Sequence, residues 1–105
     1  MGPPLRKLTI VCPREIEAAL ADALDAVEPP LPGYTIIEAH GRGGALQPAS
    51  AVERVRGALR TSMFILVLAQ DRIESVTEAV RIACPRPQIS YWMEPVEDFG
   101  RLIDA

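Results

Sequence analysis

The sequence predicts an α+β domain whose elements follow the order βαββαβ. Three observations predict it: alternating apolar residues mark the strands, apolar residues spaced three and four apart mark two helices, and prolines stand at the boundaries. Ten of the 105 residues are proline, about twice the usual share of roughly 5%. A chain of this length has room for one domain, here residues 1–105, with one modest core.

The first strand is predicted for residues 5–12, after a short flexible N-terminus at residues 1–4. Pro13 suits the first turn of a helix, because the N–H that proline lacks has no partner there in any case. The helix that follows is ended by two consecutive prolines at positions 29 and 30. Its apolar stripe, which we expect to face the core, consists of Ile16, Ala19, Leu20, Ala23, Leu24 and Val27.

A second strand is predicted for residues 34–40, after the turn sequence Pro32-Gly33. A glycine-rich run ends this strand and opens a short loop over residues 41–49. Residues 50–58 are ambiguous, since Ser50 and Glu53 fit a capping box but Gly57 disfavours a long helix.

The third strand begins near Leu59, and its run 63–69 is apolar on both faces. A second helix follows, because Asp71 and Glu74 fit another capping box and apolar residues then recur at helical spacing.

Prolines at positions 85 and 87 stop the second helix. The last strand is predicted for residues 88–93 and is ended by Pro95. Residues 96–105 form a C-terminal tail in which we expect a helical turn.

These elements together predict a ferredoxin-like sandwich, a four-stranded antiparallel sheet with two helices on one face. The other face would stay open, although the run 63–69 is apolar on both sides. A large uncovered apolar face marks an interface, so we expect a symmetric homo-oligomer that packs sheet against sheet. The alternative is that the tail folds over the open face. The residues predicted for the interface are Phe64, Leu66, Leu68, Tyr91 and Trp92.

Charge and composition exclude several classes of function. The net charge of −3 and the 5% aromatic content disfavour nucleic-acid binding, which uses basic surfaces and stacking platforms. No apolar run reaches the 18 or so residues of a membrane span, and the N-terminus does not read as a signal peptide, so we expect a cytoplasmic protein. Cys12 and Cys84 are expected at opposite edges of the sandwich, too far apart for a disulfide.

Residues 33–43 read G-Y-T-I-I-E-A-H-G-R-G and resemble the second strand and T-loop entrance of PII signalling proteins, which read G-x-T-x-x-E-x-x-G-x-G. The opening run from Lys7 to Pro13 is similar to their first strand. The ending Y-W-M-E-P, followed by F-G-R-L, resembles short uncharacterised PII-like proteins of proteobacteria. The CutA-type divalent-cation tolerance proteins are more distantly similar.

The resemblance implies a homotrimer that binds adenine nucleotides between its subunits and regulates a partner, such as a membrane transporter or efflux component. Carried over, it places Gly41, Arg42 and Gly43, with Gly44 beside them, where backbone amides approach the phosphates. The loop over residues 41–49 is much shorter than the T-loop of PII proteins. Residues 84–87 stand where the family has a glycine-rich phosphate loop.

The basic residues near the loop offer an anion site. Arginine forks match phosphate and carboxylate groups, and the alternative is an exposed face whose arginines pair with nearby glutamates. The candidate anion contacts are Arg42, Arg54, Arg56 and Arg60.

Two other functions stay open from the sequence. Glu38 and His40 share a strand face and are candidate ligands of a divalent metal; the alternative is an ordinary polar face at a strand end. The resemblance also implies a role in metal resistance, because short PII-like proteins of this type often occur near metal-efflux genes. The other possible function is that of a ligand-free oligomeric adaptor. We do not expect an enzyme, because the single histidine has no nucleophile near it in the sequence.

Overall fold

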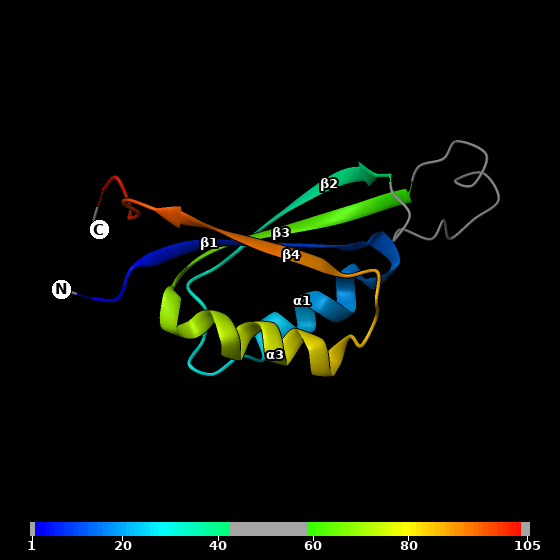
Figure 1. The fold of residues 1–105 in the computed structure, drawn as a ribbon, viewed down its shortest axis with the longest axis horizontal. Coiled ribbons are helices and arrows are strands. Elements are labelled where there is room, and N and C mark those ends of the chain that lie inside the picture. The colour runs from blue at the N-terminus through cyan, green and yellow to red at the C-terminus, as the bar shows by residue number, and fades with distance from the viewer. Residues whose placement is uncertain (1, 43–58, 104–105) are drawn as a thin grey trace.

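The computed structural model describes residues 2–42 and 59–103, and its elements follow the predicted order (Figure 1). The strands are β1 (Leu5–Pro13), β2 (Thr35–Gly41), β3 (Leu59–Ala69) and β4 (Ser90–Val96). The helices are α1 (Glu17–Asp25) and α3 (Ile73–Ala83), each preceded by a short 3₁₀ turn, η1 (Arg14–Ile16) and η2 (Gln70–Arg72).

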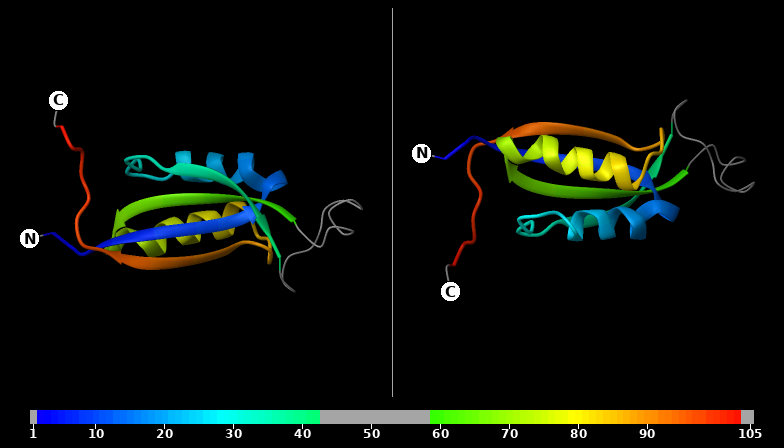
Figure 2. Two further views of the ribbon diagram at one scale, coloured as in Figure 1. Left: turned by 90° about the horizontal axis from the view of Figure 1, so that it is seen from above. Right: turned by 90° about the horizontal axis from the view of Figure 1, so that it is seen from below.

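The strands form one sheet in the order β2-β3-β1-β4, and every neighbouring pair is antiparallel. Both helices lie on the same face of this sheet (Figures 1 and 2). The α+β ferredoxin-like sandwich predicted from the sequence is therefore confirmed. Because β1 and β3 are the inner strands, β2 and β4 form opposite edges of the sheet.

The core lies between the sheet and the two helices. Alternate residues of β1 and β3 point into it, and they meet the stripe of large apolar residues predicted for the first helix. The aromatic ring of Tyr34 packs on that of Phe64, with 5.7 Å between the ring centroids. The main buried side chains are Leu8, Ile10, Cys12, Ile16, Leu20, Leu24, Phe64, Leu66, Leu68, Ile73, Val76 and Val80.

The helix α3 begins without the predicted capping box. Its N-cap position is Arg72, and no side chain caps it. The reason lies one turn earlier, where the Gln70 N–H donates to the Pro4 carbonyl at 2.8 Å and fixes the start of η2 beside β1. Asp71 then falls inside the 3₁₀ turn, which is not the boundary that a capping residue needs.

The last strand continues past the predicted stop at Pro95, which lies inside β4 opposite Arg6 of β1. The prediction was wrong because β4 is an edge strand. A proline there needs no ladder partner on the outer side, so the missing N–H costs little. The helical turn expected in the tail is also absent from residues 97–103.

The prediction that Phe64, Leu66 and Leu68 form the oligomer interface was wrong, because these residues lie on the face of β3 that the helices cover. Phe64, Leu66 and Leu68 are at most 3% exposed and belong to the core beneath the helices. Paired residues of neighbouring strands share a face, and Phe64 lies opposite the core residue Ile10. Since both faces of the run are apolar, its periodicity alone did not say which face the helices cover.

We expect Leu66→Ala to lower the free energy of unfolding by about 2–5 kcal/mol, because Leu66 is 1% exposed and the smaller side chain leaves a cavity. Ile82→Ala is the matched control, since Ile82 is 73% exposed and its truncation should change stability by about 0.5 kcal/mol or less. Urea unfolding followed by circular dichroism at one protein concentration measures both. Equal losses in the two variants would contradict the assignment of the core face.

Candidate functional site

The sheet face opposite the helices is apolar and largely uncovered. We call it the open face. Ile37 of β2 and Trp92 of β4 are each 44% exposed there. Tyr91, which was predicted for the same interface, lies opposite Ile10 and therefore faces the helix side. The large apolar residues of the open face are Val11, Ile37, Met63, Ile65, Val67 and Trp92.

The C-terminal tail passes over only one end of the open face (Figures 1 and 2). Phe99 and its neighbours line a hollow of about 330 Å³ together with Ile65 and Val67. Phe99 itself remains 59% exposed. The alternative prediction, that the tail folds over the open face, therefore holds only for one end of that face.

Polar and charged groups gather where β2 ends and β3 begins. We call Arg14, Glu38, His40, Arg42 and Arg60 the loop base. His40 lies directly opposite Arg60, so the two side chains share a face at the entrance of the loop. Arg42 and Arg60 are exposed.

Arg14 of η1 ties the two strands of the loop base together. Its Nη2 donates to the Ala39 carbonyl at 3.1 Å and to the Thr61 carbonyl at 2.9 Å, which belong to β2 and β3. Its Nη1 lies 3.9 Å from the Glu38 carboxylate. The sequence offered no signal for this role, since an arginine in a first helical turn is normally a surface residue.

The predicted ligand contacts are only partly within the described residues. Gly41 ends β2, Arg42 follows it, and Arg60 is the second residue of β3, so these three lie at the loop base. The remaining predicted contacts, Gly43, Gly44, Arg54 and Arg56, lie outside the described residues.

Glu38 and His40 lie on one face of β2, as predicted for a metal pair. Glu38 already faces the Arg14 guanidinium. Within residues 2–42 and 59–103, no three His, Cys, Asp or Glu side chains group closely enough to hold a metal ion. A protein site for zinc usually has at least three protein ligands, so this pair would need donors from elsewhere.

Cys12 and Cys84 lie at the same end of the sandwich, contrary to the prediction that they occupy opposite edges. The helix α3 runs back along β1, and this returns Cys84 to the end of the strand where Cys12 lies (Figure 1). Both thiols are buried and free. Burial, then the proximity of Cys84 and Glu17, raises the pKa of Cys12 to about 11. Burial also raises the pKa of Cys84, so neither thiol is an activated nucleophile.

No helix in the described part of the chain is long and apolar enough to cross a membrane. A family model described as "Protein of unknown function (DUF3240)" matches residues 3–103. None of the curated protein sequences matches the chain.

Solved structures share the whole fold. A DUF3240 family protein from Shewanella baltica OS155 has a TM-score of 0.77 at 17% identity, with 95% of this chain and 98% of that chain covered. Arabidopsis thaliana PII bound to citrate has a TM-score of 0.72 at 14% identity, with 95% and 82% covered. CPII, a PII-like protein from Thiomonas intermedia K12 bound to ADP, AMP and bicarbonate, has a TM-score of 0.68 at 22% identity, with 95% and 97% covered. The chain therefore has a PII-like fold.

The raised pKa of Cys12 makes stability depend on pH in the alkaline range. Between the ordinary value of 9.0 and about 11, the unfolded chain releases the thiol proton and the folded chain keeps it. The free energy of unfolding should therefore fall as pH rises through this window. Cys12→Ala should make that fall less steep, whatever its effect on stability at pH 7. Urea titrations between pH 8 and pH 11 measure the slope, and identical slopes in both proteins would contradict the prediction.

Proposed function

The chain belongs to the DUF3240 family and has a PII-like fold, and from this premise we propose that it is a regulatory protein that binds a small anionic ligand between its copies and modulates a partner. One observation carries the proposal: a loop base with exposed arginines stands at the end of a sheet whose second face carries apolar side chains that are largely uncovered, such as Ile37 and Trp92. The arginines can bind an anion through charge-assisted hydrogen bonds, and burial of the apolar open face favours association of several copies.

Assembly through the open face is the first step of the argument. The side chains of Ile37, Ile65 and Trp92 form an apolar surface across the sheet, and burial of such a surface is favourable. Between Ile65 and Trp92, the hydroxyl of Thr9 is buried without a hydrogen-bond partner in the described part of the chain. We propose a homotrimer, the state that resemblance to the PII proteins implies. A three-fold assembly brings different surfaces of neighbouring copies together, so each loop base would meet an adjacent copy.

Anion binding at the loop base is the second step. Arg14 is occupied by two main-chain carbonyls and Glu38, so it holds β2 and β3 in place. Arg42 and Arg60 are exposed at the entrance of the loop and are the proposed ligand contacts, beside Gly41. Gly43, Gly44, Arg54 and Arg56 remain proposed contacts from the sequence. An adenine nucleotide is the proposed ligand, supported by the ADP and AMP bound to the Thiomonas protein.

A regulatory role suits these residues better than catalysis. The Ser62 hydroxyl donates to the Glu17 carboxylate at 2.6 Å, and both cysteine thiols have raised pKa values. Among the described residues, the single histidine lies beside Arg60 and Glu38 and has no nucleophile next to it. We propose that the partner is a protein, such as a transporter or efflux component, contacted through residues 41–49, for which the sequence predicts a loop.

We expect ADP to raise the melting temperature of the wild-type protein by several degrees at a concentration about 100 times its Kd, because a ligand that binds only the folded state stabilises it. Arg42→Ala and Arg60→Ala should each weaken binding about tenfold or more, since each removes a charge-assisted contact. Arg101→Ala in the tail is the matched control, expected to keep the full shift. Differential scanning fluorimetry with ATP, ADP, AMP and cyclic AMP measures all four proteins.

The same experiment separates the alternatives. If no nucleotide shifts the melting temperature, the nucleotide proposal is wrong. Stabilisation by zinc that is lost in His40→Ala would favour the metal reading, with Glu38 and His40 as ligands. An adaptor would respond to neither.

A further inference from the structure

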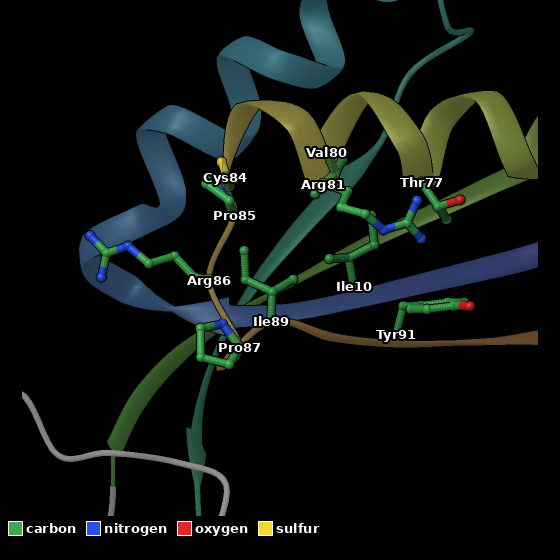
Figure 3. A pocket seen from close by; sticks show the side chains of 10 residues that line it. All are labelled: Ile10, Thr77, Val80, Arg81, Cys84, Pro85, Arg86, Pro87, Ile89 and Tyr91. Atoms are coloured by element: carbon green, nitrogen blue, oxygen red, sulfur yellow. The ribbon is translucent and has the colours of Figure 1, made fainter.

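A second hollow lies on the helix side of the sheet, between α3 and the edge strand β4 (Figure 3). Its volume is about 280 Å³, near the lower end of the range for small-molecule sites. We propose that this cavity, which we call the α3–β4 cavity, binds a small carboxylate with a compact apolar body inside a single copy of the chain. The proposal does not rest on the function proposed above.

The floor of the α3–β4 cavity is apolar and already formed. Ile10 and Val80 are 2% and 5% exposed, and Ile89 packs against the same core. The wall at residues 84–87 is a stiff turn, because two of its four residues are prolines with a fixed φ angle. The Arg86 N–H donates to the Cys84 carbonyl at 2.8 Å, which holds that turn closed. A preformed apolar floor of this kind binds an apolar body with little ordering cost.

Arg81 supplies the positive charge that would bind the ligand's carboxylate. Its side chain extends from α3 over the rim of the cavity, toward the space between Thr77 and Tyr91 (Figure 3). It pairs with Glu78, but the two side chains are 61% and 52% exposed, and an exposed pair on one helix contributes little. A ligand carboxylate can therefore replace Glu78 on the guanidinium, which offers two parallel N–H donors. The hydroxyl of Tyr91 stands at the same rim as a further donor. The Thr77 hydroxyl lines the rim too, but it already donates to the Glu74 carbonyl at 3.1 Å.

The neighbouring groups orient the ligand. Thr77, Arg81 and Tyr91 also line a neighbouring hollow of about 320 Å³, which carries the carboxylates of Glu74 and Glu78. The apolar lining of the cavity lies on the other side of Arg81, so the ligand's apolar body should extend over Ile89, with its carboxylate at Arg81. Arg86 also lines the cavity, but its side chain points away from the floor, toward η1 (Figure 3). Arg81 is therefore assigned as the anion contact, and Arg86 becomes a matched control.

The α3–β4 cavity is distinct from the loop base. The loop base lies on β2 and β3, whereas the cavity lies beside β4, at the opposite edge of the sheet. Binding of a nucleotide at the loop base and of a carboxylate in the cavity can therefore be measured separately.

The test titrates ¹⁵N-labelled protein with three probes that share one apolar body: 3-phenylpropionate, 3-phenylpropanol and 3-phenylpropylamine. We expect 3-phenylpropionate to shift the amide resonances of Thr77, Arg81 and Ile89, and to bind about tenfold more tightly than the alcohol. The amine should bind most weakly. Arg81→Gln should reduce the affinity for the carboxylate to that for the alcohol, and Arg86→Gln should leave it unchanged.

Three results would overturn the proposal. They are equal affinities for the carboxylate and the alcohol, loss of binding in Arg86→Gln with retention in Arg81→Gln, and resonance shifts confined to the open face around Val67 and Trp92. Circular dichroism of both arginine variants confirms that they fold, which is expected because both side chains are exposed. If ADP fails to bind while 3-phenylpropionate binds as described, the nucleotide proposal falls and this one stands.

Discussion

A sheet has two faces, and in the described residues two helices cover only one of them; this constraint governs the rest of the molecule. The inner strand β3 is apolar on both sides, so the helices bury one row of its side chains and leave Met63, Ile65 and Val67 of the other row only partly buried. A single copy keeps Ile37 and Trp92 each 44% exposed. Association is the physical means of removing that surface from water. The proposal that ligands bind between copies follows from this unbalanced sheet.

The end of the sheet near Gly41 and Leu59 is organised by the contacts of one partly buried side chain. Arg14 donates to carbonyls of both β2 and β3, and it reaches Glu38 as well. Hydrogen bonds to a charged donor contribute more than neutral ones, so this contact fixes the place where the loop leaves the sheet. Arg60 then stands at a defined position opposite His40, and Arg42 directly follows the end of β2. A fixed base at the end of β2 suits the regulator proposed above.

The element order, the helix stripe around Leu20 and the uncovered sheet face could be predicted from the sequence, because periodicity and proline positions report local geometry. The sequence could not predict which face of β3 the helices cover. Phe64 and Ile65 are equally apolar, and only the packing of the helices decides which of them is buried beneath the helices. Pro95 was misread because the edge position of β4 is a property of the whole sheet. The role of Arg14 depends on carbonyls 25 and 47 positions away, which spacing does not reveal.

The molar mass in solution tests the central claim most directly, because the claim requires the open face to be buried between copies. Multi-angle light scattering on the wild-type protein should give three times the chain mass of 11.4 kDa. The same measurement on Ile65→Glu, which places a charge in the middle of the open face, should give a single chain. A wild-type mass of 11.4 kDa, with a compact folded chain, would contradict the account.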